Sequence, residues 1–271
     1  MTAPSPICQS ALPFYPWTEP GGLRLPGLRP IQAETWLLRD DAFDAQMAYR
    51  DGLISTRRKS VFSAEAGATE AASECLDLVV KNVPVGSADR IQDKCIVRQD
   101  GAKVHLNDDH PLLIAGRLAQ EDFCILERRR GRYVLTAAVL CFPASWTLSE
   151  KMGRSLAGLH APVEAFDAQL DKRIERIFEA LLPDTVLMRG NALIYTDPDL
   201  HQPRPEGTVR SVDPSAPRWV RVERQTLRRL PQSEAVVFGI HTSLVPAETL
   251  PGDAFNALAV LKPELRVGVS A

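Results

Sequence analysis

The sequence has few cysteines, and they are scattered. The 271 residues include five, at Cys8, Cys75, Cys95, Cys124 and Cys141, and no two of them are spaced as Cys-x-x-Cys. The odd number argues against a disulfide framework, and the spacing argues against a zinc ribbon or a covalently attached c-type haem. We therefore predict a reducing compartment and a cytoplasmic location.

Long apolar runs and an excess of one charge are also missing. No stretch approaches the roughly 18 to 20 apolar residues of a transmembrane helix, and "MTAPSPICQSALPFYPW" lacks the basic segment and apolar core of a signal peptide. The net charge is −2 and the pI is about 6.2, which gives no electrostatic reason to expect nucleic acid as a partner. We expect neither a membrane segment nor a nucleic-acid partner.

Several catalytic and nucleotide-binding motifs are absent as well. The chain has no Walker loop, no Gly-x-Gly-x-x-Gly and no Gly-x-Ser-x-Gly, so it shows no phosphate-binding loop or serine-hydrolase elbow. Hydrophobic residues make up 45% of the chain, enough for a sizeable core in one large domain or two small ones.

Helices are predicted by apolar spacing and by proline positions. Residues 1–30 contain seven prolines, which predict an extended arm that Phe14, Tyr15 and Trp17 attach to the body. Helices are expected over 33–50, over 64–84, over 166–181 and, interrupted at its start, near 247–261.

Strands dominate the second half of the chain. "DFCILERRRGRYVLTAAVLCFP" predicts a hairpin with its turn near Arg130 and Gly131, and three further strands are expected in "VLMRGNALIYT", "RWVRVERQT" and "AVVFGIHTSL". Short, turn-linked strands after the first helices predict an α+β fold with an antiparallel sheet. We divide the chain into the arm, one domain over 31–262 and a tail over 263–271.

A histidine ends a short helix in "CFPASWTLSEKMGRSLAGLHAPV". Thr147 and Glu150 have the spacing of a capping box, which predicts the start of a helix that ends near His160, just before Pro162. His160 either caps this helix or points into a cavity and holds a ligand. The residues alone leave both interpretations open.

An arginine shares a strand face with two valines in "RWVRVERQT". Alternation places Val220, Val222 and Arg224 on one face, so the guanidinium needs an anion or several acceptors. The partner is either a protein carboxylate, with Glu121 as one candidate, or a ligand carboxylate or phosphate. Gln225 and Thr226 add donors at what we expect to be the strand end.

The remaining polar clusters give weaker indications. "HLNDDHPLL" contains His105, Asp108, Asp109 and His110, which could bind a divalent metal, although the run is more typical of a turn with a helix cap. The carboxylates of "AQED" are expected to be exposed at a strand start. We interpret His201 and His241 as hydrogen-bonded groups rather than ligands.

Four segments together resemble a known family. They are "FPASWTLSEKMGRSLAGLHAPV", "AQEDFCIL", the "RGN" of residues 189–191 and "RVERQTLRRLPQSEAVVFGIHTSL". Over about residues 10–250 the chain resembles the haem-dependent oxidative N-demethylases, which include the haem subunit of bacterial dimethylamine monooxygenase. The resemblance implies a PAS-like fold and a non-covalent b-type haem. It also implies His160 as the axial iron ligand and Arg224, beside Gln225 and Thr226, as the cation for a haem propionate.

The resemblance also implies an activity and its partners. It indicates a monooxygenase subunit that uses O₂ to remove a methyl group from a small N-methylated amine, releasing formaldehyde. Because the chain has no flavin or NAD(P)H motif, electrons would come from a flavin/NADPH reductase in trans, and the "ERRRGR" turn at 127–132 is either its docking surface or a solvated hairpin tip. The alternative is a haem-binding PAS-type sensor or interaction module without turnover.

Overall fold

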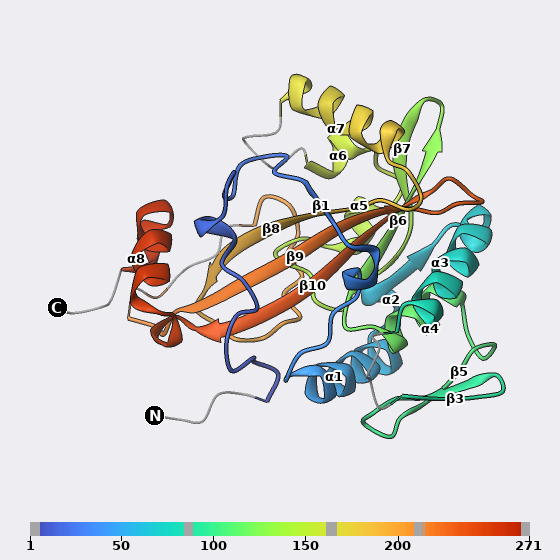
Figure 1. Cartoon of the computed structure of the whole chain (residues 1–271), viewed down its shortest axis with the longest axis horizontal. Coiled ribbons are helices and arrows are strands. Elements are labelled where there is room, and N and C mark those ends of the chain that lie inside the picture. The colour runs from blue at the N-terminus through green and yellow to red at the C-terminus, as the bar shows by residue number, and fades with distance from the viewer. Residues whose placement is uncertain (1–5, 84–88, 161–166, 209–212, 214, 267–271) are drawn as a thin grey trace.

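The fold is a large antiparallel sheet with helices on both sides, seen in a computed structural model (Figure 1). The structure describes residues 6–83, 89–160, 167–208, 213 and 215–266. In this part of the chain one sheet has the order β1-β8-β9-β10-β6-β7-β2, every neighbouring pair is antiparallel, and a small second sheet has the order β3-β4-β5. The predicted α+β class with an antiparallel sheet is confirmed.

The elements have the following bounds. The strands are β1 (Arg29–Ile31), β2 (Phe62–Ala64), β3 (Arg90–Gln92), β4 (Cys95–Val97), β5 (Lys103–His105), β6 (Asp122–Arg129), β7 (Arg132–Val139), β8 (Val186–Tyr195), β9 (Trp219–Arg229) and β10 (Val236–Pro246). The helices are α1 (Phe43–Thr56), α2 (Arg58–Val61), α3 (Thr69–Lys81), α4 (Pro111–Leu118), α5 (Leu148–Lys151), α6 (Leu156–His160), α7 (Ala168–Ala180) and α8 (Gly252–Leu261). None of the helices in the described ranges has the length and apolar content that a membrane crossing needs.

Two apolar cores lie on opposite faces of the sheet. On one face, helices α1, α3 and α4 pack against residues such as Phe123 and Val237. On the other face, α5, α6 and α7 pack against Leu227 and Ile240 (Figure 1). We call the second side the α6 face of the sheet. Alternation along each strand decides which side chains enter which core.

The predicted hairpin is β6–β7. Its two turn residues, Arg130 and Gly131, have φ values of +50° and +79°, the signs of a type I′ turn, whose twist matches that of the flanking strands. The strands predicted from "VLMRGNALIYT", "RWVRVERQT" and "AVVFGIHTSL" are β8, β9 and β10. Period-two patterning therefore located the central strands correctly.

The first helix begins later than we predicted. Helix α1 starts at Phe43 rather than near residue 33, after a 3-10 turn over Ala33–Thr35 and a stretch without regular secondary structure. Side chains from distant strands hold this stretch: Glu121 accepts a hydrogen bond from the Leu38 amide at 2.8 Å, and Asp40 is bound by Gln120 at 2.7 Å. These tertiary bonds override the helical spacing of the apolar residues.

The prediction of a capping box is wrong, and the single helix that we predicted to end near His160 is divided into α5 and α6. The Thr147 hydroxyl has no hydrogen-bond partner among the described residues, and Glu150 accepts the Glu206 amide at 3.1 Å instead of returning to its own helix start. Helix α5 ends at Lys151, and Gly153 then adopts a φ of +74°, a left-handed conformation that favours glycine. Helix α6 starts afresh at Leu156.

The N-terminal arm is attached to the body, as predicted. Trp17 is buried and donates from Nε1 to the Ala254 carbonyl of α8 at 2.9 Å. The arm crosses β8 at Gly190, where an added Cβ would come within 2.8 Å of Phe14 and closer still to Pro16. Glycine is needed there because the arm lies directly on the strand.

Candidate functional site

Helix α6 carries His160 to one side of the sheet. Leu156 and Leu159 belong to the same apolar core as Leu227 and Ile240, so the helix packs on the α6 face. His160 is its last residue. The His160 side chain and residues 161–166, with Pro162 and Phe166, lie outside the described residues.

Strand β9 has two chemically different faces. Its pairing with β8 and β10 is regular over its whole length, so Gln225 shares the α6 face with Leu227, whereas Arg224 and Thr226 lie on the opposite face. All three residues lie well inside the strand, which continues to Arg229; the expectation that Gln225 and Thr226 end it is wrong. Of the predicted cofactor-binding residues on β9, only Gln225 faces the side of α6.

Arg224 is held by backbone carbonyls. Its Nη1 donates to the Trp36 carbonyl at 2.9 Å and its Nη2 to the Thr35 carbonyl at 2.5 Å. Burial lowers the pKa of Arg224, and the attraction of Glu121 partly offsets this. The guanidinium thus has acceptors of its own on the face turned away from α6. Binding of a haem propionate by Arg224 stays a prediction, one that this geometry disfavours.

A strip of polar side chains crosses the α6 face of β8 and β9. Arg189 donates to Gln225 Oε1 at 2.7 Å, and Gln225 donates to Glu223 Oε2 at 2.9 Å; Asn191 lies 3.4 Å from the same carboxylate. We call Arg189, Asn191, Glu223 and Gln225 the polar strip. Farther along β9, Arg221 reaches the Leu200 carbonyl at 3.0 Å, so the strip lies between the loop around Leu200 and the helices α5–α7.

The polar strip is incompletely covered although it lies in mid-sheet. Arg189, Asn191 and Gln225 are all partly exposed, and Arg189 Nε is buried without a partner among the described residues. Burial lowers the pKa of Arg189, and Glu223 attracts its charge. A cation that lacks a full set of acceptors inside a sheet face is suited to an anionic group of a ligand.

Half-buried apolar side chains border the strip. They come from helices α5–α7, the segment before α5, and strands β8 and β10: Trp146, Met152, Leu159, Leu170, Leu187 and Phe238. A separate hollow of about 630 Å³ opens between the arm and α7; its lining is mixed and contains none of the residues of the strip: Leu23, Arg24, Leu25, Asp167, Gln169, Leu170 and Arg173. The α6 face therefore combines apolar side chains with Arg189, a partly exposed cation whose Nε has no acceptor among the described residues.

Sequence reasoning missed Arg189 and selected Arg224 instead. The signal was present, because alternation in "VLMRGNALIY" places Leu187, Arg189 and Asn191 on one face. The sequence could not show which face of each strand α6 covers. That requires the strand register, in which Arg189 lies opposite Gln225 and Gly190 opposite Arg224.

His241 lies on the face away from α6, in a cluster of buried charges. It pairs across the strands with Arg224; its Nε2 is 2.9 Å from Asp40, and its Nδ1 is 3.5 Å from Glu121. Burial alone would lower the pKa of His241, but the two carboxylates outweigh it and raise the pKa to about 9. The ring is thus protonated near neutral pH, unlike an imidazole that binds iron, and its interpretation as a hydrogen-bonded group is confirmed.

The carboxylates of "AQED" are buried, not exposed as we expected. Asp122 pairs with Arg50 at 2.6 Å and also accepts the amides of Cys141 and Phe142 at 2.7 and 2.8 Å. Glu121 accepts the Leu38 amide and acts on Arg224 only through longer-range attraction. These acids hold distant backbone segments in place, which explains why polar residues precede an apolar strand.

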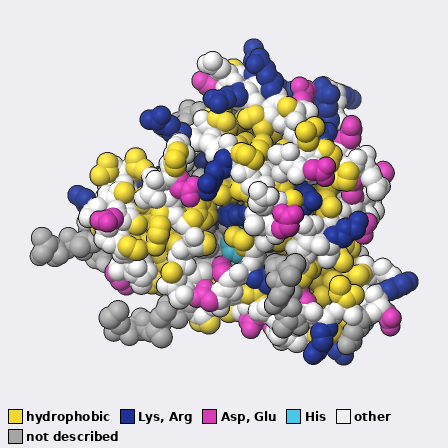
Figure 2. Space-filling model, viewed as in Figure 1, with side chains coloured by type: hydrophobic (Ala, Val, Ile, Leu, Met, Phe, Trp, Pro, Cys, Tyr) yellow, Lys and Arg dark blue, Asp and Glu magenta, His cyan; other side chains and the backbone are white. Residues whose placement is uncertain are grey.

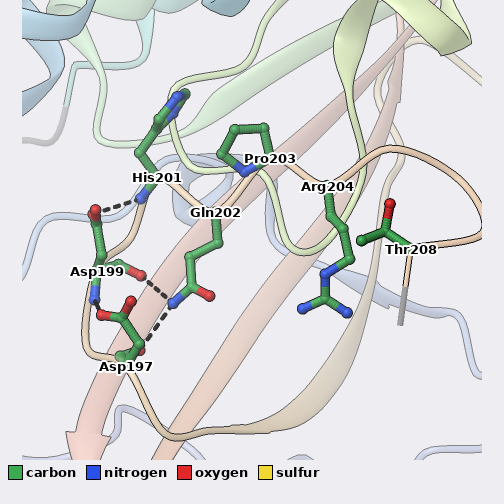
Figure 3. A pocket seen from close by; sticks show the side chains of 7 residues that line it. All are labelled: Asp197, Asp199, His201, Gln202, Pro203, Arg204 and Thr208. Atoms are coloured by element: carbon green, nitrogen blue, oxygen red, sulfur yellow. Dashed lines mark hydrogen bonds between the residues drawn. The ribbon is translucent and has the colours of Figure 1, made fainter. Parts of the chain in front are cut away.

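His201 lies in a loop that lines a second hollow, of about 390 Å³ (Figure 3). Its Nδ1 is 2.8 Å from the Cys141 carbonyl; since a carbonyl only accepts, Nδ1 donates in this bond. Below it in Figure 3, Gln202 donates to the carbonyls of Asp197 and Asp199 at 2.8 and 2.7 Å. The hydrogen bonds of this loop hold its own shape.

The "HLNDDHPLL" run is a turn with a helix cap, the interpretation we favoured. Asp109 forms a forked ion pair with Arg58 at 2.5 and 2.6 Å, and His110 Nδ1 accepts the Leu112 amide at 3.2 Å at the start of α4. Nowhere in the described residues do three or more His, Cys, Asp or Glu side chains gather as metal ligands would.

Three of the four arginines of the hairpin turn already have acidic partners. Arg128 pairs with Glu179 at 2.8 Å, Arg132 pairs with Asp171 at 3.1 Å, and Arg129 pairs with Glu65. Figure 2 shows basic and acidic side chains interspersed over the face in view. The turn is better described as an ion-paired hairpin tip than as an open cationic patch.

One comparison with known protein families gives a match. The model of a family described as haem-dependent oxidative N-demethylase, alpha subunit-like, matches residues 27–262. The match spans every element of the large sheet and every helix of the described chain.

Proposed function

Because the chain belongs to the family of haem-dependent oxidative N-demethylase alpha-subunit-like proteins, we propose that it is the haem-binding subunit of an oxygenase that demethylates a small N-methylated amine. The observation that carries this proposal is the composition of the α6 face. On this face of the sheet lie the helix that ends at His160, half-buried apolar side chains, and Arg189, whose Nε has no acceptor among the described residues.

These residues fit a haem b. A flat, largely apolar macrocycle needs an apolar slot, an axial ligand and partners for its propionates. We propose His160 as the ligand, side chains such as Leu187 and Phe238 as the wall, and Arg189 with Gln225 as the propionate site in place of Arg224. When bound, the haem iron supplies activation of O₂.

The reaction is balanced by reactants from outside the chain. One O₂, two electrons and two protons convert an N-methylated amine to the demethylated amine, formaldehyde and water. The electrons come from a flavin/NADPH reductase in trans, because the chain has no flavin or nicotinamide motif of its own. The half-buried apolar side chains of the α6 face would limit the access of water, and Glu223, the carboxylate of the polar strip, would be the partner for a cationic amine.

The strand order supports a PAS-like architecture. Taken in chain order, the five central strands β6, β7, β8, β9 and β10 lie as second, first, fifth, fourth and third across the sheet. Helices α5–α7 all fall between the second and third of these strands. This order and this helical insertion are typical of PAS domains, and the family resemblance implies the same fold.

A haem titration tests the proposal. Haemin is added to the apo-protein and to His160→Ala, and the Soret band and the dissociation constant are recorded. We expect wild-type protein to bind haem and His160→Ala to bind it roughly 100-fold more weakly, equivalent to about 2.8 kcal/mol, with an unchanged far-UV circular dichroism spectrum.

His201→Ala is the matched control, because His201 Nδ1 donates to a backbone carbonyl, as the second ring nitrogen of many metal-binding histidines does. Loss of haem in His201→Ala but not in His160→Ala would transfer the ligand role to His201. A wild-type protein without a Soret band would refute the haem function, and normal haem binding without formaldehyde release from any methylated amine would favour the sensor.

A further inference from the structure

We propose that Lys151 is a positioning residue for the axial ligand, acting through the backbone at the end of α6. The inference rests on the proposed function, since it takes His160 as the ligand. Lys151 is 4% exposed, and its Nζ donates to the Leu159 carbonyl at 2.8 Å. That carbonyl belongs to the peptide group whose nitrogen is the amide of His160. A constraint on it is therefore a constraint on the orientation of His160.

The same ammonium joins α6 to a distant loop. Lys151 Nζ also donates to Glu206 Oε1 at 2.6 Å, Arg154 donates to the same oxygen at 2.8 Å, and Glu150 accepts the Glu206 amide at 3.1 Å. We call Glu150, Lys151, Arg154 and Glu206 the α6 latch. The Glu206 carboxylate therefore binds both cations of the latch, and the Glu150 carboxylate binds the backbone of Glu206.

The loop that carries Glu206 is braced by its own hydrogen bonds and by the body. The Ser145 amide donates to the Gln202 carbonyl at 3.1 Å, and His201 holds the Cys141 carbonyl. In Figure 3 Gln202 closes the loop onto the backbone of Asp197 and Asp199. These bonds attach the loop to the body at His201 and Gln202, shortly before Glu206, so the latch connects α6 to a segment that is held at that point.

The other end of the latch is fixed to the sheet. The Gly153 amide donates to the Leu135 carbonyl at 2.9 Å, and the Leu135 amide donates to the Arg154 carbonyl at 3.0 Å. Strand β7 therefore holds the segment directly before α6, and Lys151 holds the carbonyl at its end. A five-residue helix has too few internal bonds to be rigid on its own, so these two attachments define its place.

The residue type also favours positioning over simple stability. Burying an ammonium costs several kcal/mol unless it is paired, whereas an orphan carbonyl at a helix end is ordinarily satisfied by water or a glycine cap. Lys151 lies on the α6 face, next to the helix that ends in the proposed ligand. The ion pair with Glu206 offsets the cost of burying the ammonium, and the bond to the Leu159 carbonyl holds the peptide group directly before His160.

The experiment compares Lys151→Met with Lys151→Arg and with Lys172→Met, a surface control on α7. Hydrogen exchange of the 156–160 amides is measured in the apo-protein, and the Soret maximum and haem dissociation rate are measured in the haem complex. We expect Lys151→Met to speed exchange in α6, shift the Soret maximum and raise the dissociation rate about tenfold, as loss of an outer-shell partner does. Lys151→Arg should restore part of each effect.

The outcomes separate this inference from the proposed function. If hydrogen exchange of the α6 amides is unchanged in Lys151→Met, the latch does not stabilise α6 and the inference is refuted. If exchange is faster but the Soret maximum and the haem dissociation rate are unaltered, the positioning role is refuted. A missing Soret band in the wild type overturns the proposed function itself. If Lys151→Met does not fold, Glu206→Gln weakens the same latch at a residue whose side chain is 33% exposed, and the same readouts decide.

Discussion

At the scale of single residues, buried charges join segments that are far apart in the sequence. Asp122 binds Arg50 of α1 and the amides of Cys141 and Phe142, at the start of the segment that leads to α5. Removing one member of such a pair leaves an unpaired buried charge, at a cost of about 3–5 kcal/mol. Two of the segments that resemble the family, "AQEDFCIL" and the one beginning at Phe142, are connected by this single carboxylate.

His241 predicts how stability depends on pH. Its pKa is raised to about 9, above the usual value of 6.5, so its stabilising contribution is complete below pH 6.5 and is lost as the pH rises through 9. We expect the free energy of unfolding to fall by on the order of 2–3 kcal/mol between pH 6.5 and 9.5 and this fall to be largely absent in His241→Gln.

Urea unfolding at the two pH values measures this difference. His105→Gln, at an exposed position of β5, is the control and should show the same fall in the free energy of unfolding as the wild type. An equal fall in the free energy of unfolding in wild type and His241→Gln would mean that another group titrates in this pH range.

At the scale of elements, the neighbouring strands β8 and β9 separate two arginines that look equivalent in the sequence. Arg224 lies over the carbonyls of Thr35 and Trp36 on one face of the sheet, and Arg189 lies beside Gln225 on the other. Arg224 therefore connects β9 to the segment before α1. Arg189 is the residue that we propose for a haem propionate. The alternation of side chains along a strand gives the sheet two faces. The segments that pack on each face determine which partners an arginine on that face can reach.

Paired substitutions test this division. We expect Arg224→Gln to lower the free energy of unfolding of the apo-protein by about 1–3 kcal/mol, because buried carbonyls lose their donors. Haem affinity of its folded form should be unchanged. Arg189→Gln should weaken haem binding about tenfold, since a charge-assisted bond is lost, and should leave apo stability nearly intact.

Haemin titration and urea unfolding of both variants give the answer. The reverse pattern, with haem affinity lost in Arg224→Gln and apo stability unchanged, would restore Arg224 as the propionate cation.

At the scale of the whole molecule, the N-terminal arm connects the two ends of the chain. Leu12 and Trp17 share a core with Val220 of β9 and Leu258 of α8, and β1 adds an edge strand beside β8. The part of the arm over residues 12–17 lies on the face opposite α6, where it covers Gly190. It therefore supports the sheet from behind the proposed site.

Substitution of Gly190 should detach the arm. In Gly190→Ala the new methyl group meets Phe14 and Pro16, and overpacking of this kind costs about 1–3 kcal/mol. We expect Trp17 fluorescence to shift to the red and proteolysis of the arm to accelerate.

Gly52→Ala is the matched control: Gly52 lies inside α1 with nothing within 4 Å of an added Cβ, so this variant should be neutral or more stable by about 0.5–1 kcal/mol. An arm as resistant to protease in Gly190→Ala as in wild type would contradict the close approach.

The sequence by itself determined the α+β class, the hairpin at Arg130 and Gly131, the central strands and the attachment of the arm through Trp17, because periodicity and turn chemistry are local. Only the tertiary structure decided that residues 36–42 are not helical, since bonds from Glu121 and Gln120 reach them from more than 75 residues away. It likewise decided that Thr147 and Glu150 form no capping box, because Glu206 takes the Glu150 carboxylate. Above all it decided that Arg189, not Arg224, shares a sheet face with α6. Local alternation divides a strand into two faces, but only packing assigns a helix to one of them.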